Sequence, residues 1–302
     1  MTERRHTGPS PLGGGDGLPY SKGLMTRTLM AAGVSAGRAY ELARAIERDL
    51  AARGGAAVEL DRVRALAPEV LGADEGREAV NRLGRYLALQ VLEVPIVLLI
   101  GGATGSGKSR VATEVAHRLG ITRVTSTDAI RQTMRAFFSE EFMPSIHHSS
   151  FEAGDAVAGD WPDRLVSGFL DQTRNVLVGV RAALDRALHE GLSMVIEGVH
   201  LVPGLLPTAL DGTVLVQCVL AIDDEDEHAR HFWIRDSASQ GARPLTKYLE
   251  RFRDIRRIQT FVVERARDVD VPVIENANLE RAVAEVLELV YAAAQRVEVK
   301  AE

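Results

Sequence analysis

The stretch from Gly102 to Ser109 constrains the fold of this chain more than any other part of it. It reads Gly-Ala-Thr-Gly-Ser-Gly-Lys-Ser and fits the phosphate-binding pattern G-x-x-x-x-G-K-[S/T]. The buried-strand run Val94 to Ile100 precedes it, and an amphipathic helix is expected over Arg110 to Leu119. In that order the glycines let backbone N–H groups face a phosphate, beside the positive end of the new helix. A turn that binds nothing has no need of Lys-Ser at this place, so the sequence predicts a site for a nucleoside triphosphate.

The residues of this loop have separate expected roles. Lys108 is expected to act catalytically on the β- and γ-phosphates, and the Ser109 hydroxyl to hold Mg²⁺. ATP and Mg²⁺ are therefore the expected cofactors. The predicted nucleotide contacts are the loop, the residue after it and an asparagine that ends the last predicted strand: Gly102, Ala103, Thr104, Gly105, Ser106, Gly107, Lys108, Ser109, Arg110 and Asn276.

The larger, C-terminal part of the chain predicts an α/β fold, because apolar runs suited to buried strands alternate there with helical stretches. Strands joined by helices pair in parallel and carry helices on both faces, so we expect a doubly wound parallel sheet of the P-loop NTPase type. The runs are Val94 to Ile100, Ile121 to Val124, Ser193 to Ile196, Val214 to Ile222 and Val271 to Ile274, and the helices include Arg110 to Leu119, Asp171 to His189 and Leu245 to Arg267.

The sequence before this sheet predicts two further parts. Residues 1 to 18 are rich in glycine and proline and almost devoid of apolar side chains, which predicts a disordered tail. Residues 19 to 90 place apolar side chains at helical spacing, with breaks at Gly33, Gly54-Gly55 and Pro68, so we expect a small helical domain. The sheet domain is then expected over residues 93 to 297.

Composition narrows the classes of partner. The chain has 36 Lys+Arg against 42 Asp+Glu and a net charge of -6, so it lacks the positive field that would hold nucleic acid or anionic lipid. No apolar run approaches the roughly 18 residues of a membrane span. The single cysteine, Cys218, lies in an apolar run, which predicts a buried strand position in a reducing compartment. We therefore expect a cytoplasmic protein that acts on a small molecule; the sequence does not indicate its oligomeric state.

Polar residues follow the second predicted strand at its carboxyl end, where an open parallel sheet binds its ligands. Asp128 is a candidate to take a proton from a substrate hydroxyl, or to bind a magnesium shell through water. Arg131 and Arg135 share one helix face and are candidate contacts for an anionic acceptor. The alternatives are that Thr127 or Asp128 only caps the helix, and that the arginines form a solvated stripe.

Three other segments carry candidate residues. After the third strand, Glu197 is a candidate to orient Mg²⁺ through water and to contact the acceptor, and His200 is a candidate acceptor ligand. His148 lies in a polar loop that either contacts the acceptor or is an ordinary surface loop, and its spacing to other ligands fits no zinc site. Arg230 and Arg235 follow an acidic run and are candidate catalytic residues, able to neutralise charge on the transferred phosphoryl group from a closing segment.

Together these motifs resemble the 2-phosphoglycerate kinase family, whose members use ATP to convert 2-phosphoglycerate into 2,3-bisphosphoglycerate. The resemblance covers most of residues 19 to 280. It implies a kinase in which Asp128 positions or deprotonates the acceptor hydroxyl while Arg131, Arg135 and His200 hold the acceptor, a small phosphorylated molecule. The matching stretches are Pro19 to Gly23, Ile100 to Ser109, Ser126 to Arg131, Met134-Arg135, His148 to Phe151, Val195 to Gly204 and Ile274 to Asn276.

The same resemblance implies that residues 19 to 90 are similar to an ATP-cone, a small helical module that binds nucleotide. The family has a β-forming segment ahead of the motif Pro-Tyr-Ser-Lys-Gly, where this chain has its glycine- and proline-rich tail. Related kinases with other acceptors, such as the zeta toxins that phosphorylate UDP-sugars, leave another anionic metabolite as an alternative substrate. A nucleotide-dependent switch with no acceptor is the alternative of a different class, but it would not need the acceptor-side features at Asp128 and Glu197.

Overall fold

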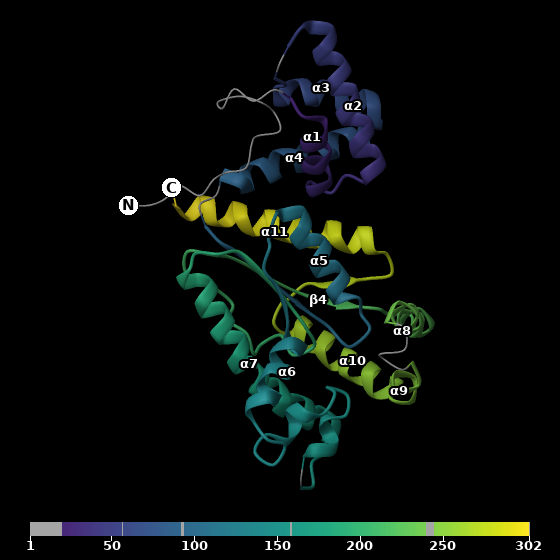
Figure 1. Ribbon diagram of the computed structural model, residues 1–302, viewed down its shortest axis with the longest axis vertical. Coiled ribbons are helices and arrows are strands. Elements are labelled where there is room, and N and C mark those ends of the chain that lie inside the picture. Colours follow the sequence, from purple (N-terminus) through teal and green to yellow (C-terminus); the bar gives the residue numbers. More distant parts are fainter. Residues whose placement is uncertain (1–19, 56, 92–93, 158, 240–244, 302) are drawn as a thin grey trace. The chain divides into compact units, whose positions relative to one another are not determined.

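A computed structural model describes residues 20–55, 57–91, 94–157, 159–239 and 245–301 of the chain (Figure 1). The tail predicted over residues 1 to 18 lies outside these ranges. The chain divides into a helical unit, made of Met1–Glu93, His117–Gly120 and Leu287–Glu302, and a sheet unit, made of Val94–Ala116 and Ile121–Val286. In the described ranges no helix has both the length and the apolar character needed to cross a membrane. A cytoplasmic location stays a prediction.

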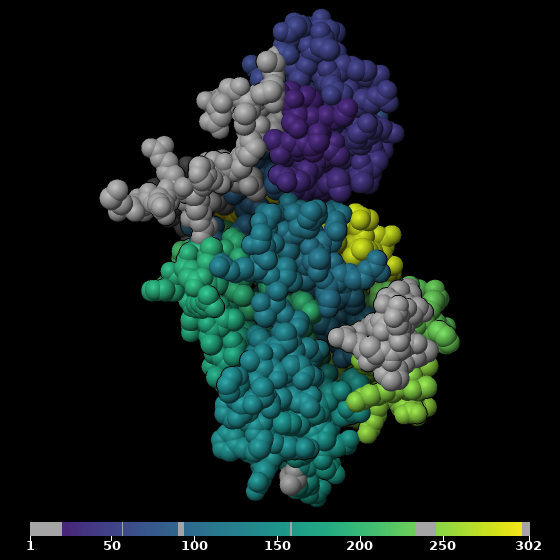
Figure 2. Space-filling model, in the orientation of Figure 1, coloured from purple at the N-terminus to yellow at the C-terminus, as the bar shows by residue number. Residues whose placement is uncertain are grey.

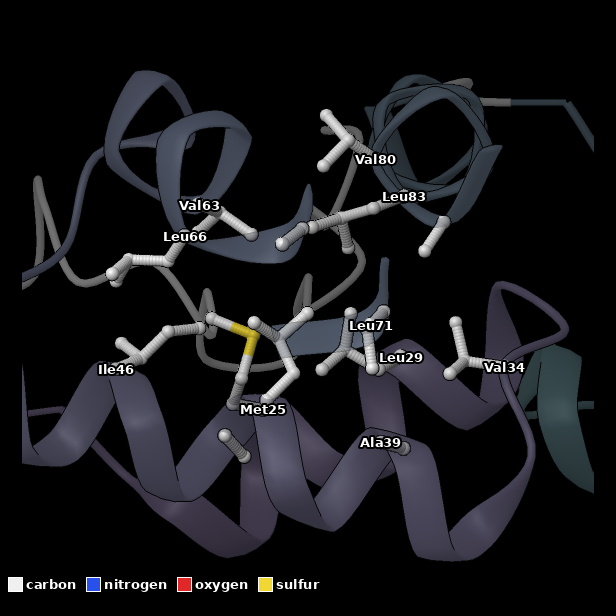
Figure 3. Packing of buried hydrophobic residues seen from close by; sticks show 14 of the residues in the cluster. Met25, Leu29, Val34, Ala39, Ile46, Val63, Leu66, Leu71, Val80 and Leu83 are labelled. Carbon is white, nitrogen blue, oxygen red and sulfur yellow. The ribbon is translucent and has the colours of Figure 1, made fainter. Parts of the chain in front are cut away.

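The first part of the helical unit is a bundle of short helices around an apolar core. Ser21 caps the first helix by accepting a hydrogen bond from the Leu24 N–H at 3.3 Å, and Gly54 ends the second in the left-handed conformation at φ 67°. Met25 and Leu29 of the first helix meet residues of the other three in a core whose packing Figure 3 shows. The helices are α1 (Lys22–Ala31), α2 (Ala36–Arg53), α3 (Leu60–Leu71) and α4 (Ala73–Val91).

Pro68 was expected to end a helix, and this expectation is wrong because Pro68 lies inside α3. The helix continues to Leu71 and stops at Gly72, whose φ is 92°. An internal proline costs about 3 kcal/mol. Val63, Leu66 and Leu71 are all buried in the core of the unit, and burial of each such side chain contributes about 1.5–3 kcal/mol, which together outweighs that cost.

The sheet unit confirms the predicted doubly wound α/β fold. In the part of the chain that the structure describes, a five-stranded sheet runs in the order β2-β3-β1-β4-β5, and every neighbouring pair is parallel. Cys218 is buried in β4, as expected for a residue in that apolar run. The strands are β1 (Ile96–Gly101), β2 (Val124–Ser126), β3 (Met194–Glu197), β4 (Val214–Ala221) and β5 (Val273–Glu275).

Helices cover the sheet in the pattern that parallel crossovers require. Val97 and Leu99 of β1 pack with the long helix α7, while α10 packs against β4 and β5 on the same side. Figure 1 shows α5 on the other side of the sheet. The remaining elements are α5 (Lys108–Leu119), α6 (Thr127–Phe137), α7 (Arg164–His189), α8 (Glu225–Ser239), α9 (Leu245–Glu250), α10 (Phe252–Asp268), α11 (Leu279–Ala301) and the 3₁₀ turns η1 (Pro144–His147) and η2 (Ala153–Ala156).

Several element boundaries differ from the predicted ones, and three of the differences exceed two residues or divide a predicted helix. α7 begins at Arg164, because the Asp163 carboxylate caps it by accepting from the Val166 N–H at 3.1 Å. β2 begins at Val124 rather than ending there, because its pairing with β3 starts at that residue. The helix expected over Leu245 to Arg267 is divided into α9 and α10.

The register of the sheet determines where a ligand site can form. β1 lies between β3 and β4, so the connections from its two neighbours leave in different directions and open a crevice at the carboxyl end of β1. Ile100 of β1 and Ser126 of β2 both pair with Glu197 of β3. The phosphate loop, Glu197 and the start of α6 therefore meet at one edge of the sheet.

Candidate active site

The loop between β1 and α5 has a backbone that its glycines make possible. Gly105 and Gly107 have φ values of 87° and 82°, which L side chains rarely adopt. A Cβ at Gly107 would overlap the Asn276 amide, and a Cβ at Gly105 would overlap the Phe232 ring. Both the conformation and the close approach of neighbouring side chains therefore require glycine.

Three side chains from outside the loop hold successive carbonyl oxygens of it. His228 Nε2 donates to Thr104 O at 2.8 Å, His231 Nδ1 donates to Gly105 O at 3.0 Å, and Asn276 Nδ2 donates to Ser106 O at 2.8 Å. Because a trans peptide places its N–H opposite its C=O, the bonds at Thr104 O and Ser106 O turn the N–H groups of Gly105 and Gly107 away from His228 and Asn276. The loop is thereby shaped to offer N–H groups to an anion.

Asn276 was expected to contact the nucleotide, and the structure places it 4% exposed against the loop itself. Sequence reasoning missed His228 and His231. Their spacing of three residues puts both on one face of α8, and that spacing is the signal that could have indicated a shared role.

Lys108 lies at the centre of the loop. Its side chain is buried, and its Nζ donates to Ala103 O at 2.6 Å and lies 3.5 Å from Ser106 Oγ. Burial lowers the pKa of Lys108, while the nearby carboxylates of Glu197 and Asp128 oppose that shift. The Lys108 amine is thus held where phosphate oxygens would be bound, and it is close enough to both carboxylates to interact with them electrostatically.

The residues at the start of α5 and the end of β3 fit a magnesium ion. Ser109 Oγ donates to Glu197 Oε1 at 2.9 Å, and Glu197 is 7% exposed. Within the described ranges, no group of three or more His, Cys, Asp or Glu side chains could enclose a metal. Mg²⁺ prefers oxygen ligands and usually takes only one or two from protein, with the rest from phosphate and water. The hydroxyl and carboxylate pair meets that requirement.

Asp128 stands at the start of α6 with its carboxylate 65% exposed and 3.4 Å from Arg131 Nε. The alternative in which Thr127 or Asp128 caps this helix is wrong. The cap is Ser126, whose Oγ accepts from the Ala129 N–H at 3.0 Å. The Asp128 carboxylate is therefore not needed to start the helix, and it faces solvent near Lys108.

The two arginines of α6 have different surroundings. Arg131 is 8% exposed, and its Nη1 donates to Ile146 O and to His148 O, both at 2.8 Å. Arg131 therefore does not belong to a solvated stripe. Arg135 is exposed, and its Nη1 donates to Gln132 Oε1 at 3.2 Å on the same helix. The structure brings Arg131 to Asp128 and to η1, and leaves Arg135 on the surface.

His200 is fully buried, although it was expected to contact the acceptor. Its Nδ1 lies 2.8 Å from Thr127 Oγ1 and its Nε2 lies 2.9 Å from Gln172 Oε1. Both ring nitrogens are thus used within the protein. The side chain of His148 is partly exposed beside Glu140, with 3.8 Å between His148 Nε2 and Glu140 Oε1.

The remaining predicted residues lie on helix surfaces. Arg110 is exposed in the first turn of α5, and Arg230 is exposed on α8 with its Nη1 donating to Glu227 Oε2 at 2.9 Å. The side chain of Arg235 lies outside the part of the chain that the structure describes. Figure 2 shows the acceptor-side segment from α6 to η2, in teal, at the surface of the sheet unit.

Comparison with known proteins identifies close relatives along nearly the whole chain. No protein-family model matches it. The 2-phosphoglycerate kinase of Thermococcus kodakarensis is 40% identical over 271 residues, covering 89% of this chain and 92% of that protein. The 2-phosphoglycerate kinase of Methanopyrus kandleri is 36% identical over 272 residues, covering 89% and 83% of the two chains. That of Pyrococcus horikoshii is 36% identical over 272 residues, covering 90% and 89%.

A solved structure from Chloroflexus aurantiacus is also similar, with 13% identity and a TM-score of 0.36. The match covers 68% of this chain and 97% of the other.

Proposed function

The chain belongs to the 2-phosphoglycerate kinase family, and we propose that it transfers the γ-phosphoryl group of ATP to the 3-hydroxyl of 2-phosphoglycerate, giving ADP and 2,3-bisphosphoglycerate. One observation supports this most directly. The phosphate loop with Lys108, the Ser109 and Glu197 pair, and the exposed carboxylate of Asp128 lie at the same edge of the sheet. A kinase needs these groups together, because the transferred phosphoryl group passes between the two substrates.

On the nucleotide side, Lys108 and the loop N–H groups would bind the β- and γ-phosphates, with Arg110 at their outer edge. Ser109 would hold Mg²⁺ directly and Glu197 would hold it through water. When bound, Mg²⁺ supplies positive charge beside the phosphate oxygens. Arg230 and Arg235, both on α8, are proposed to neutralise negative charge on the transferred phosphoryl group.

On the acceptor side, the 3-hydroxyl oxygen would form a bond to the γ-phosphorus while the bond from that phosphorus to the β,γ-bridging oxygen breaks. The hydroxyl proton would pass to the Asp128 carboxylate. Arg131 would hold that carboxylate in place through its Nε at 3.4 Å. Arg135 and His148 are proposed to contact the acceptor's anionic groups, since they lie on α6 and beside η1, the two segments that Arg131 joins.

Replacement of Lys108 or Asp128 by alanine tests these roles. Lys108→Ala is expected to lower kcat by on the order of 100-fold or more, because the variant loses a preorganised side chain that stabilises negative charge on the transferred group. Asp128→Ala is expected to lower kcat by about 100- to 10,000-fold through loss of the proton acceptor. The assay is acceptor-dependent ADP release, with product mass and circular dichroism measured on each variant. Thr133→Ala, on the exposed face of α6, is the matched control.

Two results would contradict the proposal. Near-normal turnover of Asp128→Ala with 2-phosphoglycerate would remove its assigned role. ADP release stimulated by another anionic metabolite and not by 2-phosphoglycerate would retain the kinase and replace the acceptor.

A further inference from the structure

Three fully buried polar side chains form a continuous hydrogen-bonded series beneath the acceptor side of the site. Thr127 begins α6, His200 follows β3, and Gln172 lies in the N-terminal half of α7, and each is 0% exposed. The distances are 2.8 Å from Thr127 Oγ1 to His200 Nδ1 and 2.9 Å from His200 Nε2 to Gln172 Oε1. Three elements far apart in the sequence are therefore joined through side chains that do not reach solvent.

The surroundings of Gln172 determine the direction of each hydrogen bond. Its amide nitrogen donates to Ser145 O and, at 3.0 Å, to His148 O. Since carbonyl oxygens only accept, this end of the amide is the NH₂ group and Oε1 must be the acceptor. His200 Nε2 therefore carries the hydrogen, and its Nδ1 accepts from the Thr127 hydroxyl. Burial lowers the pKa of His200 to about 4, consistent with a neutral ring near pH 7.

The series is connected at one end to the proposed proton acceptor. Thr127 is the residue directly before Asp128, and its side chain fills the space that a Cβ on Gly198 would need. Thr127 is thus held between the glycine that follows Glu197 and the His200 ring. Any displacement of Thr127 displaces the backbone of Asp128.

At the other end the series is connected to the segment around η1. His148 O accepts from both Gln172 Nε2 and Arg131 Nη1, and Arg131 also lies 3.4 Å from the Asp128 carboxylate. Gln172 therefore contacts a member of each of the two hydrogen-bonded paths that connect the η1 segment to Asp128. One path runs through His200 and Thr127, and the other runs through Arg131.

We propose that Gln172, acting through His200 and Thr127, is a positioning residue that sets the Asp128 carboxylate relative to the acceptor loop at η1. This rests on the proposed function, because it assigns a purpose to the geometry of the acceptor side. None of the three side chains touches the reacting atoms. Their effect is to hold a catalytic group in place, and a misplacement of about 1 Å can cost on the order of 100-fold in rate.

Thr127 allows a matched test. Thr127→Val keeps the shape of the side chain and removes the hydroxyl that donates to His200, whereas Thr127→Ser keeps the hydroxyl and removes only the methyl group. We expect Thr127→Val to lower kcat with 2-phosphoglycerate by roughly 10- to 100-fold, with KM for ATP changed less than about 2-fold. Thr127→Ser should recover most of the wild-type kcat. If Thr127 contributes only packing, Thr127→Val will have a higher kcat than Thr127→Ser.

Gln172→Met supplies a second readout that does not depend on catalysis. The ¹⁵N chemical shifts of the histidine rings report which nitrogen carries the hydrogen, and the His200 signals can be assigned from their loss in His200→Gln. The wild-type protein and Thr127→Val should both show hydrogen on Nε2 of His200. In Gln172→Met the acceptor is gone, so the hydrogen should move to Nδ1 and be donated to the Thr127 hydroxyl.

The outcomes separate this inference from the proposed function. Hydrogen on Nδ1 in the wild-type protein, or equal kcat for Thr127→Val and the wild type, would overturn the inference even if 2-phosphoglycerate is the acceptor. A wild-type protein that releases no ADP with 2-phosphoglycerate would overturn the proposed function. In that case the ring signals, together with the Val and Ser variants on whichever acceptor is found, would still decide the inference.

Discussion

Lowering the pH from 7 toward 4.5 is expected to destabilise the sheet unit through two buried histidines. His200 and His228 are both 0% exposed, and burial is the largest cause that lowers the pKa of each to about 4. In an unfolded chain a histidine titrates near pH 6.5. Between these two values the unfolded state binds a proton at each position that the folded state does not bind.

The sign and size of the effect follow from this difference. Stability rises with pH wherever the unfolded state binds more protons, so here it falls as the pH drops below about 6.5. One proton corresponds to a slope of about 1.4 kcal/mol per pH unit, and the full shift to about 4 removes roughly 3 kcal/mol for each histidine. The free energy of unfolding of a typical protein is about 5–15 kcal/mol, so the two histidines together account for a large fraction of that free energy.

Urea unfolding between pH 4.5 and 7.5 measures this slope. The chain has 2 tryptophans, Trp161 and Trp233, and both lie in the sheet unit, so their fluorescence follows that unit. His200→Gln lowers stability at every pH because it breaks a buried hydrogen-bond series, but the slope is independent of that loss. We expect the slope of the variant to be smaller than that of the wild type by up to about 1.4 kcal/mol per pH unit.

The exposed His189 provides the control, since His189→Gln tests for the effect of a histidine substitution as such. An equal slope for His200→Gln and the wild type between pH 6.5 and 4.5 would refute a contribution of His200 to the pH dependence. Equal slopes would mean that His200 takes up its proton in the folded protein as readily as in the unfolded chain.

Two further predictions concern the phosphate loop and the helical core. Gly107→Ala should weaken Mg-ATP binding at least about 10-fold by calorimetry, because the φ of 82° costs an alanine about 1–3 kcal/mol and the added Cβ overlaps Asn276. Gly84→Ala is the control, since a Cβ at that position of α4 meets open space. Unchanged affinity of Gly107→Ala would show that the loop adapts to the added methyl group. Leu29→Ala should lower the free energy of unfolding of the helical unit by about 2–5 kcal/mol, because it leaves a buried cavity. Hydrogen exchange of the amides of α1 to α4 measures this change. A decrease below about 1 kcal/mol would mean that the core collapses around the cavity.

The resemblance to an ATP-cone raises the question of whether the helical unit binds nucleotide. In its described residues from 20 to 91 every regular element is a helix, and the resemblance to an ATP-cone rests on the sequence alone. Titration of Lys108→Ala with ATP would reveal a second site if one exists, because the phosphate loop would no longer dominate binding.

The sequence predicted the features that depend on neighbouring residues. The alternation of apolar runs with helical stretches gave the parallel sheet, since strand and helix periods are properties of a few consecutive side chains. The loop from Gly102 to Ser109 was recognisable because all its parts are contiguous. The acidic residues at the ends of β2 and β3 could be placed near it from the general rule that ligands bind at the carboxyl ends of parallel strands.

Only the tertiary structure decided which polar residues are buried and what they bind. His200 was expected to face the acceptor, yet it is enclosed by Thr127 and Gln172, which lie 73 and 28 residues away. Arg131 and Arg135 look equivalent on one helix face, but Arg131 donates to carbonyl oxygens in η1 and directly after it, whereas Arg135 is exposed. Burial depends on which elements pack together, and hydrogen-bond partners come from distant parts of the chain, so local patterns cannot indicate either.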